Sequence, residues 1–253
     1  MNLLIVTTDS HQILYEEFFL KTVPGNITTL RKVLNSAGEG NYLSSSWQAG
    51  VTTKLKWALE CFEKHPEEIF VLSDVDIQFF PSFSFEDLHR ELRDSGRDVL
   101  FQKETRFPEC REVNTGFYIA KSTPWSVELF REAISVCESL SSQNDQVAIN
   151  AILSNRDQPD KWGHLPLCYY ARSQGFPPPS DAVLHHANVT ANIGEKIAQL
   201  RRVKCWVTGG YLSRWRAIIA EILLYVYSGK LLAKLRRIIR KVATSRNLLV
   251  ISS

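Results

Sequence analysis

Short apolar runs alternate with amphipathic stretches along most of the chain, and this alternation restricts the folds open to it. Residues 3–7, 69–72 and 99–102 are brief apolar runs, typical of strands buried on both faces of a sheet. Between the first two runs lies the apolar stripe of an amphipathic helix, formed by Trp47, Val51, Leu55, Ala58 and Phe62. Strands joined by helices predict an α/β domain with a mainly parallel sheet and helices on both faces.

The rest of the chain extends this pattern. Further strands are expected at residues 27–33, 113–120, 162–165 and 183–186. Further helices are expected at residues 12–20, 86–93, 124–140, 144–153 and 194–203. In sheets of this kind, ligands bind beyond the carboxyl ends of the strands. Two polar segments occupy such ends, namely Thr7, Thr8 and Asp9 after the first strand and Asp74 and Asp76 after the third.

Asp74 and Asp76 are separated by one residue, directly after an apolar strand. On an extended segment, residues two apart point to the same side, so both carboxylates can reach one cation. Carboxylates suit Mg²⁺ or Mn²⁺, which also bind substrate phosphates and stabilise a departing diphosphate. The alternative is a pair of loop carboxylates that cap the next element. So short a motif depends on its context for support.

Two further polar segments lie downstream. Asn114 and Gly116 stand within an expected strand, where a glycine marks either a simple bulge or a close approach that admits a sugar ring. Asn144, Asp145 and Gln146 open an expected helix, so Asn144 or Asp145 can act as an N-cap. The functional alternative places Asp145 and Gln146 against a donor sugar.

A pair of histidines, His185 and His186, ends the strand expected at residues 183–186, and Asn188 and Lys196 follow. A histidine near two aspartates would complete a metal site, and a lysine can neutralise phosphate as a point charge. The simpler interpretation of either histidine is a structural role.

Four of these segments occur in an order that resembles the nucleotide-diphospho-sugar transferases of the plant α-xylosyl and α-galactosyl transferase type. The order is also similar, more distantly, to the galactosyltransferases related to glycogenin. The segments are Ser-Asp74-Val-Asp76, Asn114-Thr-Gly116-Phe, Asn-Asp145-Gln146 with Asn150, and His186-Ala-Asn188 with Lys196. The resemblance covers about residues 1–205, and four motifs in order are more specific than any one of them.

The resemblance implies a GT-A fold, which is a single nucleotide-binding α/β domain. It also implies Mn²⁺ (or Mg²⁺) and a nucleotide-sugar donor, with a UDP-sugar favoured. It assigns Asp74, Asp76 and His186 to the metal, with Asp74 nearer the ribose. Because the histidine is doubled in this sequence, His185 remains an alternative to His186.

The same resemblance assigns the remaining donor-binding positions. Lys54 is similar to a lysine that the family places just before the two aspartates, and Asp145 and Gln146 match residues near the sugar in retaining members. Retention of the anomeric configuration is therefore favoured. Lys196 would meet the phosphates, although the family's Lys-Pro-Trp ending is absent, since Ile and Ala follow the lysine here. The other implied donor-binding residues are Thr7, Thr8, Asp9, Asn114, Gly116 and Asn188.

The charge of the chain is unevenly distributed. From Lys196 onward there are 13 Lys and Arg residues and one acidic residue, whereas the preceding 195 residues hold 17 basic and 26 acidic ones. Residues 230–242 pair Leu and Ile with Lys and Arg, the pattern of a cationic amphipathic helix that lies on an anionic membrane. The alternative is a helix packed on the domain with a solvated basic face. A nucleic-acid partner is not expected, because no aromatic platform or binding motif accompanies the charge.

Cysteine content and the N-terminal segment bear on the compartment. The five cysteines are widely spaced and odd in number, as in a reduced cytosolic protein. The N-terminal segment has about four consecutive apolar residues and no basic flank, unlike a signal peptide. A cytoplasmic location, with peripheral membrane attachment, is therefore predicted.

The sequence thus predicts a metal-dependent GT-A glycosyltransferase at residues 1–205, followed by a basic helical tail at residues 206–253. Its substrates would be a nucleotide sugar and a glycan, lipid-linked or protein acceptor. A phosphoesterase would need more clustered ligands than six scattered histidines offer. A non-catalytic nucleotide-sugar or membrane-binding module of the same fold is the remaining alternative.

Overall fold

The structure is a computed structural model that describes residues 1–25, 27–34, 45–139, 144–156 and 158–227. The chain divides into two compact units, residues 1–203 and 204–253. The functional division into a transferase at residues 1–205 and a tail at residues 206–253 remains a prediction. The cationic helix expected at residues 230–242 lies outside the described residues.

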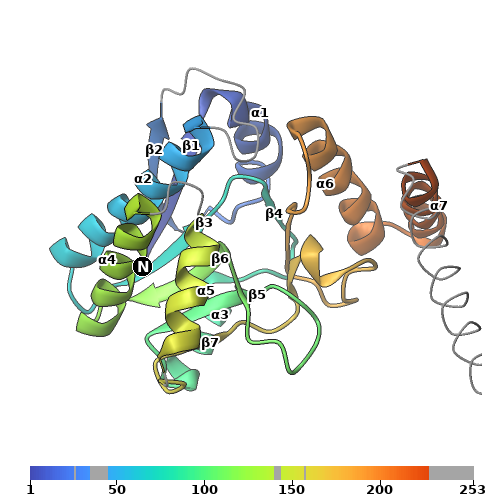
Figure 1. The fold of residues 1–253 in the computed structure, drawn as a ribbon. Helices are drawn as coiled ribbons and strands as arrows, with labels where there is room; N and C mark the ends of the chain where they lie inside the picture. The colour runs from blue at the N-terminus through green and yellow to red at the C-terminus, as the bar shows by residue number, and fades with distance from the viewer. Residues whose placement is uncertain (26, 35–44, 140–143, 157, 228–253) are drawn as a thin grey trace, which may run out of the picture. The chain divides into compact units, whose positions relative to one another are not determined.

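A six-stranded sheet with the order β2-β1-β3-β6-β5-β7 forms the centre of the first unit (Figure 1). β1 pairs in parallel with β2 and β3, and β5 pairs in parallel with β7, whereas β6 runs antiparallel to both β3 and β5. The mainly parallel sheet that the sequence predicts is confirmed, with β6 as its reversed strand. The strands are β1 (Asn2–Thr8), β2 (Thr28–Leu34), β3 (Ile69–Ser73), β5 (Val99–Lys103), β6 (Val113–Lys121) and β7 (Trp162–His164).

Helices cover both faces of this sheet. On one face, α2 (Ser45–Lys64), α4 (Pro124–Ser139) and α5 (Asp145–Asn155) pack against one another (Figure 1). The other face is covered by α1 (Gln12–Leu14) with the π-helical turn that continues it (Tyr15–Phe19), by α3 (Phe85–Ser95) and by α6 (Ile193–Thr208). The prediction of helices on both faces is therefore confirmed.

Two hydrophobic clusters follow from this arrangement, because successive strand residues point to opposite faces. In β1, Leu3 and Ile5 belong to one buried cluster and Leu4 belongs to the other. In β3, Val71 packs in the first cluster, while Phe70 packs in the second. Burial on both faces is the reason that these strands appear in the sequence as unbroken apolar runs.

A second sheet has three short strands in the order β4-β9-β8. They are β4 (Ile77–Phe79), β8 (Tyr169–Ala171) and β9 (Leu184–His186). β4 follows the two aspartates and runs antiparallel to β9, so that Ile77 lies opposite His186. The sequence predicted β9, at residues 183–186, but not β4 or β8. This pairing places His185 and His186 beside the loop that holds Asp74 and Asp76, which we call the aspartate loop.

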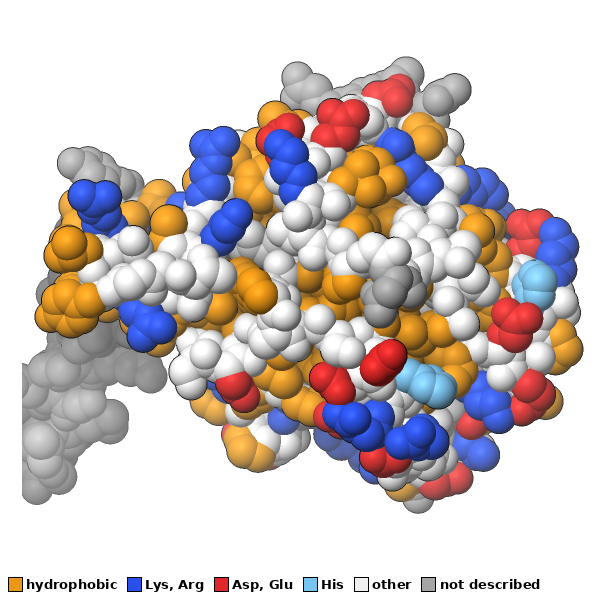
Figure 2. All heavy atoms as spheres, turned by 180° about the vertical axis from the view of Figure 1, so that it is seen from behind, with side chains coloured by type: hydrophobic (Ala, Val, Ile, Leu, Met, Phe, Trp, Pro, Cys, Tyr) orange, Lys and Arg blue, Asp and Glu red, His pale blue; other side chains and the backbone are white. Residues whose placement is uncertain are grey.

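The second unit contains the end of α6 and α7 (Tyr211–Tyr227). Within the described ranges, no helix combines the length and apolar character that crossing a bilayer requires. Figure 2 shows basic and acidic side chains mixed around the edge of one face of the first unit, while hydrophobic side chains and other uncharged atoms occupy the centre of that face. The five cysteines are all free thiols, as expected.

Candidate active site

The two aspartates lie in the short loop between β3 and β4, at the carboxyl end of a central strand. The backbone nitrogen of Asp74 donates a hydrogen bond to the Gly116 carbonyl of β6, at 2.7 Å. The Asp76 carbonyl accepts a hydrogen bond from the backbone nitrogen of Ala187, just after β9, at 2.9 Å. The loop is thereby fixed between the two sheets, which gives its carboxylates defined positions.

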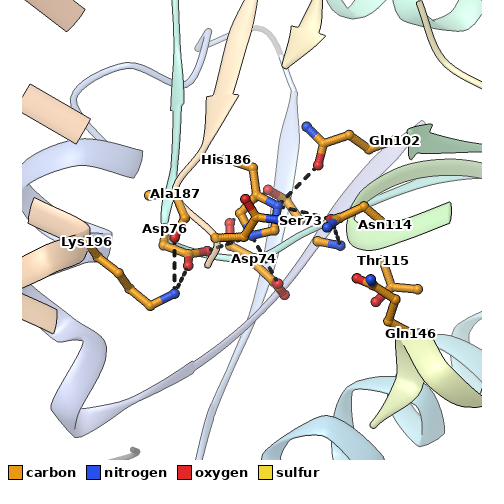
Figure 3. A network of polar contacts seen from close by, with 12 residues as sticks. Ser73, Asp74, Asp76, Gln102, Asn114, Thr115, Gln146, His186, Ala187 and Lys196 are labelled. Atoms are coloured by element: carbon orange, nitrogen blue, oxygen red, sulfur yellow. Dashed lines mark hydrogen bonds and ion pairs between the residues drawn. The ribbon is translucent and has the colours of Figure 1, made fainter. Parts of the chain in front are cut away.

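Asp74, Asp76 and His186 come together at this loop (Figure 3). One ligand atom from each residue lies within 4.8 Å of the other two. The His186 Nε2 atom is 3.5 Å from an Asp76 oxygen and 3.9 Å from an Asp74 oxygen. Two carboxylates and an imidazole nitrogen are donors that suit Mn²⁺ or Mg²⁺. The residues present therefore fit the divalent cation that the sequence predicts.

The two histidines of β9 point to opposite sides of the small sheet, as consecutive strand residues do. His185 is fully buried and stacks on Tyr170, with the ring centroids 5.4 Å apart. Its Nδ1 atom lies 3.0 Å from the amide nitrogen of Gln78. Burial holds the pKa of His185 well below its usual value, so this ring is neutral. Of the two histidines that the sequence left open, the structure brings His186 to the aspartates.

Gly116 lies against the His186 ring. A Cβ atom at this position would be 2.1 Å from the His186 Cε1 atom and 2.5 Å from Nδ1. Only glycine permits β6 to approach the imidazole this closely. The sequence suggested either a bulge here or space for a sugar ring, and the structure gives this space to His186. The register shift in this strand pair lies between Phe101 and Gln102 of β5.

Lys54 connects the aspartate loop to α5. Its ammonium group lies 3.0 Å from an Asp74 oxygen and 2.7 Å from an Asp145 oxygen. It also donates a hydrogen bond to the Thr115 carbonyl, at 3.3 Å. Burial would lower the pKa of Lys54, but the two carboxylates outweigh it and raise that pKa above its usual value. Lys54 is therefore a permanent positive charge between the predicted metal ligands and the predicted sugar-binding residues.

Lys196 reaches Asp76 from the first turn of α6 (Figure 3). Its ammonium group forms an ion pair with an Asp76 oxygen and donates a hydrogen bond to the Ala187 carbonyl at 3.3 Å. Burial raises the pKa of Asp76, but the charge of Lys196 and its hydrogen bond to this carboxylate lower it more, so that this pKa lies below its usual value. Asp76 is therefore ionised at neutral pH and ready to accept a cation.

α5 places Asp145 beside Lys54. The side-chain oxygen of Asn144 caps this helix by accepting a backbone hydrogen bond from its third residue, at 2.7 Å. Asp145 is buried, and one of its oxygens accepts a hydrogen bond from the Gln146 backbone nitrogen at 2.9 Å. Asn150 exchanges hydrogen bonds with the Val113 backbone at 2.8 and 2.9 Å, which ties α5 to β6. The cap is Asn144, and the Asp145 carboxylate pairs with Lys54.

The loop after β1 lies near the same site. Thr7 is buried, Asp9 is exposed, and the Thr8 hydroxyl forms a hydrogen bond with the His11 Nδ1 atom at 2.9 Å. His11 interacts electrostatically with Asp76, and burial lowers the pKa of His11 below its usual value. Residues 7–9 were predicted from the sequence but His11 was not, although a histidine just beyond the same strand end was a usable signal.

Two further polar side chains lie behind His186. Its Nδ1 atom is 3.2 Å from the Gln102 side-chain oxygen and 3.1 Å from that of Asn114. Gln102 was also missed, although a polar residue at the end of an apolar run was a usable signal. The Asn188 side chain bonds to a different segment, since its oxygen accepts a hydrogen bond from the Ser173 backbone nitrogen at 2.8 Å.

Comparison with known proteins agrees with this geometry. Residues 1–199 match the nucleotide-diphospho-sugar transferase family. No curated protein matches the sequence of the chain. A solved glycosyltransferase involved in the glycosylation of the major capsid of PBCV-1 is similar, with a TM-score of 0.55 and 12% identity, over 78% of this chain and 98% of that one. Mouse xyloside xylosyltransferase 1 in its apo form aligns over 76% of this chain and 99% of its own, with 12% identity and a TM-score of 0.47.

The family match covers more than three quarters of the chain and contains all the residues brought together above. The PBCV-1 structure supports the same fold at the level of the backbone. We conclude that this chain belongs to the nucleotide-diphospho-sugar transferase family and is a glycosyltransferase with the GT-A fold.

Proposed function

We propose that this glycosyltransferase uses a nucleotide diphosphate donor, a UDP-sugar by preference, and binds Mn²⁺ or Mg²⁺ through Asp74, Asp76 and His186. The observation that carries the proposal is the convergence of these three side chains within 4.8 Å. When bound, the cation would stabilise the charge that develops on the departing diphosphate, a contribution of roughly several kcal/mol. The acceptor is proposed to be a glycan, lipid-linked or protein group.

The donor phosphates are proposed to contact Lys196, whose ammonium group already lies at the metal ligands through its ion pair with Asp76. Thr7, Thr8 and Asp9 are proposed to hold the nucleotide. Thr7 and Thr8 form the carboxyl end of β1 and Asp9 follows it, in the region where open α/β sheets bind their ligands. Asn188 remains a proposed donor-binding residue on the resemblance alone.

Asp145 and Gln146 are proposed to face the donor sugar. Asp145 is buried and ionically bound to Lys54, and its carboxylate can accept hydrogen bonds from sugar hydroxyl groups. Retention of the anomeric configuration is proposed from the resemblance at these two positions. We assign no general base, and the departing phosphate would take the acceptor proton.

Two loops are proposed to contact the acceptor, residues 105–112 and 175–180. Arg106 joins them, because its guanidinium group donates hydrogen bonds to the carbonyls of Gly175, at 2.8 Å, and of Pro177. Phe107, in the first loop, is 66% exposed and offers an apolar ring face to a binding partner.

The donor and the metal can be tested together by measuring nucleotide release from a panel of UDP- and GDP-sugars, with Mn²⁺ and with a chelator. We expect slow, metal-dependent hydrolysis of one donor, reduced at least about 100-fold in Asp76→Asn. Asp94→Asn is the matched control, since Asp94 is exposed and pairs with Arg93 on α3. Metal-independent hydrolysis would refute the proposed metal site, and metal-dependent binding without turnover would favour a non-catalytic module.

We propose further that residues 206–253 attach the enzyme to an anionic membrane surface. The supporting observation is that α7 exposes many large apolar side chains instead of burying them. The basic residues that follow in the sequence would add electrostatic attraction to anionic lipids. The exposed apolar side chains of α7 are Tyr211, Leu212, Trp215, Ile219, Ile222, Leu223, Leu224, Tyr225 and Val226.

Flotation on vesicles tests this attachment. The full chain should float with vesicles that contain phosphatidylserine and much less with neutral phosphatidylcholine vesicles. Replacing Lys230, Lys234, Arg236 and Arg237 by glutamine should reduce recovery on the anionic vesicles. Equal recovery on anionic vesicles of the full chain and of a chain that lacks residues 229–253 would refute the proposed attachment.

A further inference from the structure

The Nδ1 atom of His186 faces two side-chain oxygens, Gln102 Oε1 at 3.2 Å and Asn114 Oδ1 at 3.1 Å (Figure 3). Amide oxygens accept hydrogen bonds and cannot donate them, so the Nδ1 atom must carry the hydrogen. A neutral imidazole has one N–H group, and the Nε2 atom therefore presents its lone pair. This Nε2 atom is the one that lies 3.5 Å from Asp76 Oδ1.

Hydrogen bonds hold the side-chain amides of Gln102 and Asn114 with their oxygen atoms toward His186 Nδ1. The Gln102 nitrogen donates a hydrogen bond to the Tyr169 carbonyl at 3.0 Å, which leaves its oxygen toward His186. The Asn114 nitrogen donates to a Glu104 oxygen at 2.6 Å, while its oxygen also accepts from the Gly116 backbone nitrogen at 2.9 Å. Gln102 is fully buried, so its orientation is set by these protein partners.

The neighbouring histidine has the opposite arrangement. The Gln78 nitrogen lies 2.8 Å from the Leu200 carbonyl and 3.0 Å from the His185 Nδ1 atom. A carbonyl only accepts, so Gln78 turns its NH₂ group to His185, and the Nδ1 atom of His185 is the acceptor. Two buried glutamines with opposite amide orientations therefore specify opposite tautomers for two adjacent histidines.

We propose that Gln102, together with Asn114, is a positioning residue that holds His186 as its Nδ1–H tautomer and thereby directs the Nε2 lone pair at Asp74 and Asp76. This inference rests on the proposed metal site. A histidine ligand must be unprotonated at the nitrogen that binds the ion. Loss of the group that fixes the other ring nitrogen typically costs about 10–100-fold in metal affinity.

The tautomer is tested first on the metal-free protein, by long-range ¹H–¹⁵N correlation of the histidine rings. His186 should carry its hydrogen on Nδ1 and His185 on Nε2. In Gln102→Met, which is similar in shape but has no amide, the Nε2–H form of His186 should appear, whereas His185 should not change. The matched control Gln78→Met should alter His185 and leave His186 as it is. An Nε2–H form of His186 in the wild type would overturn the proposal.

Mn²⁺ binding, measured by calorimetry, is the second readout. We expect Gln102→Met to weaken the affinity about 10-fold, at the low end of the range above, because Asn114 still accepts one hydrogen bond. Gln102→Glu should restore it, since a protonated Glu can donate to the Tyr169 carbonyl and accept from His186. Equal losses in Gln102→Met and Gln78→Met would overturn the positioning role. A wild-type chain with the expected tautomer but no Mn²⁺ affinity would instead refute the proposed metal site.

Discussion

Replacing Gly116 by alanine should disturb the candidate metal site through one added methyl group. The new Cβ atom would lie 2.1 Å from His186 Cε1, whereas ordinary contacts begin at 3.4 Å. The ring must move by roughly 1 Å, or β6 must yield, and interiors resist both because they are closely packed. Movement of the ring would also break its hydrogen bonds to Gln102 and Asn114.

The size of the effect on stability follows from two opposing contributions. Overpacking of this kind costs about 1–3 kcal/mol, and replacing a glycine within a strand returns about 0.5–1 kcal/mol. We therefore expect the free energy of unfolding to fall by about 1 kcal/mol, and by no more than about 2.5 kcal/mol, and each kcal/mol lowers Tm by about 2–4 °C in a chain of this length. Gly25→Ala is the control, since its added Cβ atom would meet no atom of the described part of the chain within 4 Å.

A double-mutant cycle shows whether the loss comes from this clash. His186→Ala removes the ring that the new methyl group meets, so Gly116→Ala should cost little in that background. Urea unfolding, with unchanged m-values, should give a coupling energy of about 1–3 kcal/mol between the two substitutions, because the glycine contribution is the same in both backgrounds and cancels. Additivity within about 0.5 kcal/mol would refute the reasoning, because the methyl group would then not meet the ring.

Three other predictions concern charge and backbone freedom. Lys196→Met should raise the affinity for Mn²⁺ alone by about 10-fold, because ammonium and metal compete for Asp76, and should weaken UDP binding in the presence of Mn²⁺. Calorimetry measures both affinities, and an unchanged affinity for Mn²⁺ would contradict the competition. Gly50→Ala should raise the free energy of unfolding by about 0.5–1 kcal/mol in urea, because Gly50 lies within α2 and, among the residues that the structure describes, its Cβ atom would contact Leu34 alone, at an ordinary 3.8 Å. The lowered pKa of Asp76 means that its carboxylate stabilises the fold above about pH 4 and that this contribution is lost as the pH falls through the folded-state pKa. Urea unfolding from about pH 7 to pH 3 should therefore show a shallower loss of stability in Asp76→Asn than in the wild type.

Most of the large sheet could be predicted from the sequence because its strands are buried on both faces. Leu3, Leu4 and Ile5 all lie inside, two in one cluster and one in the other, so the run is apolar without interruption. Of the small sheet, β9 was predicted at residues 183–186, but β4 and β8 were not, since each is three residues long and depends on β9 for its pairing. The reversal of β6 also left no trace, because a strand buried on both faces has the same pattern in either direction.

The residues of the candidate site could be selected from the sequence by their chemical type, but the side chains that they contact in the fold could not be predicted. Asp74, Asp76 and His186 were selected from the aspartate motif and from a resemblance. Which histidine faces the aspartates depends on the face of the small sheet to which its side chain points. The register of β9 against β4 decides this. Gln102 looked like the polar end of a strand, and its contact with His186 spans 84 positions in the chain.

The charges of the site explain why a metal ion and a donor diphosphate should bind together. Among the described residues, two ammonium groups, those of Lys54 and Lys196, pair with Asp74, Asp76 and Asp145, which leaves one net negative charge. A divalent cation alone would reverse that sign, and a diphosphate alone would add to it. Both together restore the original balance, so each ligand should raise the affinity for the other. Lys54 is held by Asp145 and the Thr115 carbonyl as well as Asp74, whereas Lys196 has Asp76 as its carboxylate partner. We therefore expect Lys196 to be the cation that would exchange Asp76 for a donor phosphate if a metal ion binds there.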